Sequence, residues 1–118
     1  ITAKDSYRLT HGDWLKLWTA ASAAGELPVF HIKMKSSILG HTEIVVIPAD
    51  AAPYSSMRYL TQRKTRGFVL HSTYFDRHAD RQDRFTLTGP YQGEVQDFDL
   101  VALNYASFLA FVEENRTP

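Results

Sequence analysis

Apolar residues recur with a helical period in the first part of the chain. They are spaced by three or four positions and form one stripe, which consists of Trp14, Leu17, Trp18, Ala21 and Ala24. Thr10 followed three positions later by Asp13 has the form of a capping box. Gly25 suits the left-handed position that follows a helix, and Pro28 prevents its continuation. The pattern therefore predicts a helix over about 11–24, with both tryptophans in the core rather than exposed for stacking.

The period changes to two immediately after this helix. Apolar and polar residues alternate in the order Phe30, His31, Ile32, Lys33, Met34, Lys35. This alternation predicts a strand over about 29–35 with one buried face. Gly40 marks a turn within 36–41, and the nearly continuous apolar run from Thr42 to Ile47 is typical of a central strand. Residues 1–9, which precede the helix, are expected to be extended.

The middle of the chain carries a concentration of basic residues. Asp50 and Pro53 have the positions expected of a cap and a first turn, and predict a short helix that includes Leu60. Basic side chains would gather at its C-terminal end, where cations are favourable: Arg58, Arg63, Lys64 and Arg66. Gly67 opens the run FVLHSTYF, which predicts a strand, and residues 76–84 mix charges of both signs, which predicts an exposed loop.

The remaining pattern predicts a hairpin of 84–88 and 94–97 around the segment GPYQG, with Gly89-Pro90 as the turn signal. A short strand and a last helix complete the chain, at 100–103 and after a cap at Asn104 or Ser107. This order of elements predicts an α/β or α+β fold, in which a single central mixed sheet is flanked by two to three helices.

The length of 118 residues suits a single domain, 1–118. The chain begins at Ile1 without an initiator methionine, so we expect a fragment or part of a longer chain. No apolar run approaches the roughly 20 residues that a membrane helix needs, and no signal peptide is visible. We therefore expect a cytoplasmic protein with no membrane partner.

The net charge is zero, but it is unevenly distributed. Residues 1–66 contain nine Lys/Arg and five Asp/Glu, a balance of +4, whereas residues 67–118 contain four and eight, a balance of −4. Such an electric dipole can orient a domain toward a polyanion. The alternative is that these charges are simply solvated surface residues.

Several kinds of active site lack support in the sequence. There is no cysteine, no GxGxxG, Walker or GxSxG motif, and no HExxH. The five histidines are scattered, so a small-molecule enzyme with a histidine-lined pocket has no spacing to support it. The run from Asp76 to Asp80 alternates Asp, His and Asp as a cation site could, but it is better interpreted as a charged loop.

Nucleic-acid contact has support from the basic residues. Polar and basic side chains share one face of the first segment and one face of the strand after the helix: Lys4, Ser6, Arg8, Lys33 and Lys35. Residues of these types commonly bind phosphates. Arg63, Lys64 and Arg66 form a further cluster. Each of these residues is also an ordinary surface residue.

The sequence also contains an ordered pattern that resembles a known family. It reads T-x-K-D-S-Y-R-L-T, three residues, W-x-K, a helix, G-x-x-P and an apolar strand, and covers Thr2 to Thr10, Trp14, Lys16, Gly25, Pro28 and the strand to Met34. It resembles the region after the catalytic strand in phage-type Holliday-junction-resolvase-like nucleases of the PD-(D/E)XK superfamily. The segment from Leu100 to Leu109 is similar to the family's usual ending. The resemblance covers about a third of the chain and implies a restriction-endonuclease-like fold.

The resemblance also implies a metal-dependent phosphodiesterase, in which two acidic residues and a Glu-x-Lys strand hold a divalent cation. Those positions would precede Ile1, so the usual catalytic motif is absent from this chain. One internal substitute is Asp83 with Glu94 and Gln96, which have the order of a D…ExQ variant and could hold Mg²⁺ if they met. A solvated hairpin carries such residues just as readily.

Two functions follow as hypotheses. The first is a nucleic-acid-associated domain of a phage-type PD-(D/E)XK nuclease that binds DNA phosphates, with Mg²⁺-dependent hydrolysis only if catalytic strands are supplied; it would act in the cytoplasm, or the host cytoplasm if viral. The alternative is a non-enzymatic phage structural or protein-interaction module. A homodimer or a larger assembly is compatible with either.

Overall fold

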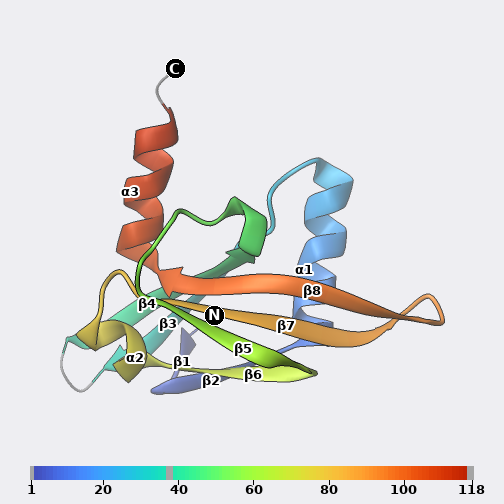
Figure 1. The fold of residues 1–118 in the computed structure, drawn as a ribbon, viewed down its shortest axis with the longest axis horizontal. Helices are drawn as coiled ribbons and strands as arrows, with labels where there is room; N and C mark the ends of the chain where they lie inside the picture. The colour runs from blue at the N-terminus through green and yellow to red at the C-terminus, as the bar shows by residue number, and fades with distance from the viewer. Residues whose placement is uncertain (1, 37–38, 117–118) are drawn as a thin grey trace.

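In the computed structural model, which describes residues 2–36 and 39–116, six strands form a mixed central sheet (Figure 1). Across the sheet they are β1 (Thr2–Ala3), β3 (Phe30–Ser36), β4 (Gly40–Pro48), β8 (Glu94–Asn104), β7 (Gln82–Tyr91) and β5 (Arg58–Thr65). The two outer pairs, β1–β3 and β5–β7, are parallel, and the three inner pairs are antiparallel. The predicted α+β fold with a central mixed sheet is therefore confirmed.

A separate antiparallel ribbon of β2 (Ser6–Thr10) and β6 (Gly67–His71) packs on one face of this sheet. Helices α1 (His11–Ala24) and α2 (Ser72–Arg77) contribute Trp14 and Phe75 to the same core. We call this side the ribbon face. A smaller core on the opposite side, the α3 face, packs against α3 (Tyr105–Arg116) and the 3₁₀ turn Ala49–Ala51. In Figure 1 the ribbon lies below β7 and β8, and α3 rises above them.

Helix α1 has the predicted limits and caps. The Asp13 N–H donates to Thr10 Oγ1 over 3.1 Å, and the Thr10 N–H donates to Asp13 Oδ2 over 3.2 Å, which completes the capping box. Gly25 follows the helix with a φ of 68°, a conformation that glycine adopts without strain. Trp14 is fully buried in the core as expected, whereas Trp18 is partly buried and packs against the core beside Tyr91 and Phe98.

Strands β3 and β4 also confirm the predicted pattern. Ile32 and Met34 are buried on the ribbon face, whereas Lys33 and Lys35 are exposed on the α3 face. Strand β4 lies between β3 and β8, as its nearly continuous apolar run predicts. Residues 37–38 of the turn between β3 and β4 lie outside the described residues.

The helix predicted after Asp50 is wrong. The structure has only the 3₁₀ turn there, and the basic segment that was expected to end a helix forms the edge strand β5. The apolar residues of this segment are too sparse to bury one face of a helix. Pairing with β7 in parallel instead satisfies the backbone N–H and C=O groups along one side of β5. Strand β5 remains mostly exposed, and its pairing with β7 shifts register between Leu60 and Lys64.

The strand predicted from Gly67 is divided between two elements. Strand β6 ends at His71, and the next residues form α2, whose Phe75 is 1% exposed. The Ser72 N–H donates to the carbonyl of Asp5 over 2.9 Å, which helps to end the ribbon at this point. The predicted loop over 76–84 is correspondingly shorter, because α2 takes its first residues and β7 its last.

The hairpin turn lies at Gln92-Gly93 and not at Gly89-Pro90. Gln92 and Gly93 have φ values of 51° and 80°, which match the tight turn that joins two twisted strands. Pro90 has no N–H to donate to a neighbouring strand. It lies in β7 beyond the end of β5, so β7 needs no donor there on the side that faces β5. Strand β8 then runs without interruption to Asn104, so the predicted strand 100–103 is its second half.

Asn104 precedes the last helix, and its side chain accepts a hydrogen bond from the Ala106 N–H over 2.8 Å. Of the two predicted caps, Asn104 is therefore the one that caps the helix. Ser107 instead donates to the carbonyl of Ala79 over 2.7 Å, so it ties the helix to the α2–β7 connection. None of the helices within residues 2–36 and 39–116 has the length and apolar content needed to cross a membrane.

Candidate nucleic-acid interface

The predicted phosphate-contacting residues do not form one surface. Lys33 and Lys35 project from the α3 face of β3, whereas Ser6 and Arg8 lie on the ribbon, which packs on the opposite side of the sheet. Lys4 lies between β1 and β2, where its carbonyl accepts from the Lys35 N–H over 2.8 Å. A single straight duplex segment would therefore meet one group or the other.

The lysines of β3 lie near a carboxylate. Lys33 is the register partner of Glu43, and Glu43 Oε1 is 3.1 Å from His31 Nε2. An adjacent carboxylate reduces the attraction of this surface for phosphate. We therefore regard the β3 lysines as the weaker part of the predicted set.

Strand pairing in the ribbon brings together two basic segments that are distant in sequence. Thr10 is the register partner of Gly67, and the guanidinium of Arg8 lies directly over Gly67, since a Cβ built there would be 2.4 Å from Arg8 Cζ. The His11 N–H donates to the carbonyl of Arg66 over 2.8 Å. Arg8 and Arg66 consequently flank the beginning of α1.

Both arginines line a groove of about 400 Å³ between the ribbon, α1 and β7. We call it the basic groove; its lining residues are Arg8, Thr10, His11, Gly12, Leu15, Arg66, Thr88, Gly89 and Pro90. A smaller neighbouring groove of about 290 Å³ shares Arg66 and the 88–90 segment, and extends past Gly93 to Glu94 and Val95. The two grooves are therefore adjacent, with Arg66 in the lining of both.

The charge around the basic groove is set by nearby pairs. The Lys64 Nζ is 2.5 Å from Asp97 Oδ2, and this contact lowers the pKa of Asp97 and raises the pKa of Lys64. Lys64 is therefore already paired, and it adds little net charge. Residues 51–75 contain no Asp or Glu, so Arg63 and Arg66 have no acidic neighbour within that part of the sequence.

The basic and acidic halves of the sequence do not form two separate sides of the molecule. Strands β7 and β8, which carry four of the eight acidic residues of the acidic half, lie between β4 and β5 of the basic half. The Lys64–Asp97 pair shows this mixing directly. The positive charge at the basic groove therefore comes from the residues nearby, and not from a separation of charge across the whole molecule.

His11 is an unexpected part of this site. Its side chain is 5% exposed, its ring packs 5.5 Å from that of Phe98, and its Nε2 has no hydrogen-bond partner in the described part of the chain. The ring lies against Gly89, where a Cβ would be 2.4 Å from His11 Nδ1. Gly89 is therefore a close-approach residue and not the turn residue that the sequence indicated.

The two close-approach glycines give a matched pair of predictions. Gly89→Ala is expected to destabilise the fold by about 1–3 kcal/mol, because the buried imidazole must move to admit a methyl group. Gly67→Ala should stay within about 0.5–1 kcal/mol of the wild type, since only the flexible end of Arg8 has to move. Urea denaturation followed by circular dichroism measures both. Equal losses for the two variants would contradict the placement of His11.

The predicted D…ExQ metal site is not formed. Asp83 is the register partner of Ala102, whereas Glu94 is the partner of Tyr91 at the far end of the hairpin. The eight residue steps along β8 from Glu94 to Ala102 separate these positions by about 27 Å at the usual strand rise. The two carboxylates therefore cannot hold the same Mg²⁺.

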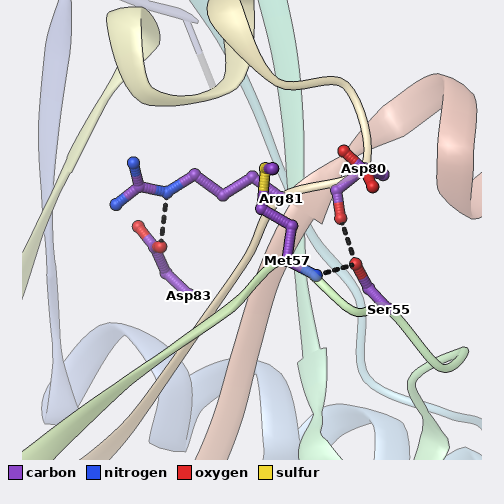
Figure 2. A network of polar contacts seen from close by, with 5 residues as sticks. All are labelled: Ser55, Met57, Asp80, Arg81 and Asp83. Atoms are coloured by element: carbon purple, nitrogen blue, oxygen red, sulfur yellow. Dashed lines mark hydrogen bonds and ion pairs between the residues drawn. The ribbon is translucent and has the colours of Figure 1, made fainter.

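Asp83 has a structural partner instead. It is 3% exposed, and its Oδ1 lies 2.8 Å from Arg81 Nε (Figure 2). The Arg81 guanidinium lies between the rings of Tyr59 and Tyr74, 4.0 and 4.4 Å from their centroids. Burial raises the pKa of Asp83, and the ion pair with Arg81 opposes this rise.

The alternating acidic run that begins at Asp76 is also separated by the fold. The Asp76 carboxylate accepts hydrogen bonds from the hydroxyls of Ser36 and Thr42, so it is directed at β3 and β4. His78 and Asp80 lie beyond the end of α2 and are exposed. Within residues 2–36 and 39–116, no group of three or more His, Asp or Glu side chains is arranged to hold a metal ion.

No protein-family model, curated protein or solved structure matches this chain.

Proposed function

We propose that this domain binds nucleic acid through the basic groove, with Arg8 and Arg66 contacting backbone phosphates. The observation that carries the proposal is the convergence of these two arginines, 58 positions apart in sequence, on one groove. Guanidinium groups suit phosphate because they donate two parallel hydrogen bonds. Thr10 adds a hydroxyl group to the same lining, a residue type that commonly positions a nucleic-acid backbone, whereas the Thr88 hydroxyl is hydrogen-bonded to Asp97.

The sequence resembles that of phage-type PD-(D/E)XK nucleases. A domain of this kind would serve a phage-type nuclease of the PD-(D/E)XK class in the cytoplasm, or in the host cytoplasm for a viral protein. Hydrolysis would require Mg²⁺ and acidic ligands from elsewhere, because the described carboxylates do not converge. The part assigned to this chain is therefore phosphate binding.

The test is binding of a fluorescent DNA duplex, a single strand and a four-way junction, each measured by anisotropy over a range of salt concentrations. Arg8→Gln combined with Arg66→Gln should weaken binding at least about tenfold at low salt and reduce the slope of log K against log salt by about 2. The matched control is Lys33→Gln with Lys35→Gln, which removes the same charge from the α3 face. It should leave the affinity within about twofold.

Two outcomes would overturn the proposal. One is an equal loss of affinity in both double variants, which would show attraction by overall charge. The other is the absence of salt-dependent binding to any of the three DNA probes. A preference among the probes would identify the form of nucleic acid that the groove accepts.

A protein-interaction module is the second candidate function, and the exposed edge of β5 favours it. Strand β5 ends the sheet, and Tyr59 and Leu60 are 48% and 74% exposed. Such an edge can pair with another strand. Salt-insensitive self-association in sedimentation experiments, without DNA binding, would favour this function over the first.

A further inference from the structure

A cleft of about 420 Å³ lies at the opposite end of β7 from the basic groove. It is bounded by the 53–56 segment, by Asp80 to Gln82, and by one side of α3. Its apolar walls come from Pro53, Tyr54, Leu103, Ala110 and Phe111. We call it the α3 cleft. Its volume is in the range of small-molecule sites.

Three polar side chains of the α3 cleft already donate hydrogen bonds within the protein. Gln82 Nε2 donates to the carbonyl of Pro53 over 2.5 Å. The Ser55 hydroxyl donates to the carbonyl of Asp80 over 2.5 Å, as Figure 2 shows. The Ser107 hydroxyl donates to the carbonyl of Ala79 over 2.7 Å. The two hydroxyls and one N–H of Gln82 are therefore already used as donors, and the oxygen atoms of these side chains retain lone pairs that can accept from a ligand.

Gln82 provides the observation that points to a ligand. It is 2% exposed and lines the cleft, and its Oε1 has no hydrogen-bond partner among the described residues. The orientation of the amide follows from Pro53, whose carbonyl can only accept. A buried acceptor without a partner is costly, so a ligand that donates a hydrogen bond would be stabilised here.

The charges of the cleft select the same class of ligand. Asp80 and Glu114 add carboxylates to its lining. The one cationic lining residue, Arg81, is paired with Asp83 and held between Tyr59 and Tyr74. Arg58 lies outside the lining, with its guanidinium 4.9 Å from the ring centroid of Tyr54. The cleft is therefore apolar, supplied with acceptors, and negative.

We propose that the α3 cleft binds a small organic cation with an apolar body, namely an amine or a guanidinium group. The apolar walls would cover the body, and the cationic head would donate to Gln82 Oε1 and to the carboxylates of Asp80 and Glu114. This site is independent of phosphate binding at the basic groove, because the two ligands have opposite charges and the two sites lie at opposite ends of β7. The cation is either a free amine or the side chain of a basic residue in a peptide.

The first experiment compares 2-phenylethylamine with 2-phenylethanol, its uncharged counterpart, by isothermal titration calorimetry and by amide chemical shifts of the full chain. The amine should bind at least about fivefold more tightly than the alcohol, with shifts at Gln82, Ser107 and Phe111. Nα-acetyl-lysine N-methylamide tests the peptide source in parallel. Tighter binding of the lysine derivative assigns the site to a peptide, and tighter binding of the amine assigns it to a free amine.

Two neighbouring glutamates provide matched variants. Glu114→Gln removes a lining carboxylate and should weaken amine binding by about two- to fivefold, while the alcohol is unaffected. Glu113→Gln is the control, because Glu113 is outside the lining and pairs with Arg116 over 3.3 Å. Both side chains are exposed, so both variants should fold.

Three results would overturn the proposal. The alcohol could bind as tightly as the amine, the two glutamate variants could weaken binding equally, or neither cation could shift the cleft residues. None of these results depends on whether DNA binds the basic groove, so the two proposals can fail separately.

Discussion

Trp14→Ala is expected to lower the free energy of unfolding by about 3–5 kcal/mol. Trp14 is fully buried and belongs to the core that joins α1, the ribbon and the central sheet. Its ring meets that of Phe98 edge-on at 6.5 Å. Its Nε1 has no hydrogen-bond partner in the described residues, so the loss should come from packing alone.

Urea denaturation monitored by far-UV circular dichroism measures this loss, and Trp18 remains as a fluorescence probe. Leu27→Ala is the control, because Leu27 is 50% exposed; its stability should stay within about 0.5 kcal/mol of the wild type. A loss below about 1.5 kcal/mol for Trp14→Ala would show that the core can do without this side chain.

Arg81→Ala is expected to cost about 3–5 kcal/mol at neutral pH. The substitution leaves the buried carboxylate of Asp83 without its cation and removes the contacts of the guanidinium with Tyr59 and Tyr74. Breaking one partner of a buried pair is costly because the other charge stays desolvated. Denaturation in urea at pH 7 measures the effect.

The pH dependence of the stability of Arg81→Ala tests how much of the lost stability is electrostatic. Burial already raises the folded-state pKa of Asp83, and the loss of Arg81 would raise that pKa further. The folded state then binds the proton more tightly than the unfolded state, so stability falls as pH rises from the ordinary aspartate pKa to the folded pKa. Acidification through this window should therefore recover part of the stability lost in Arg81→Ala.

The double variant Arg81→Met with Asp83→Leu separates charge from packing. It removes both charges and keeps apolar volume, so it should lose less stability than Arg81→Ala, with no recovery in acid that is due to this site. A double variant as unstable as the single one would show that the tyrosine contacts, and not the uncompensated carboxylate, dominate.

The local sequence was sufficient for the elements whose signals all agree. In α1, the apolar stripe, the Thr10–Asp13 box and Gly25 define the same helix independently. In β3, strict alternation predicts both the strand and the face that Ile32 and Met34 bury. Patterns of this kind depend on a few neighbouring residues and need no distant partner.

Local signals misled where a distant contact determines the role of a residue. Gly89 has the appearance of a turn residue, but it is glycine because the ring of His11 lies against it. The segment from Arg58 to Thr65 has no strong period, and its pairing with β7 makes it a strand. The order Asp83…Glu94 suggested a shared site, yet antiparallel pairing places these carboxylates at opposite ends of the hairpin.

The sequence by itself determined the α+β class, the first helix, the two strands that follow it, and the chemical types of residue available for phosphate binding. Only the tertiary structure decided which of those residues meet. It joined Arg8 to Arg66 through the β2–β6 pairing and placed Lys33 and Lys35 on the other side of the sheet. The physical reason is that helix caps and hydrophobic periods are local, whereas strand pairing and groove formation depend on which distant segments bury the same core.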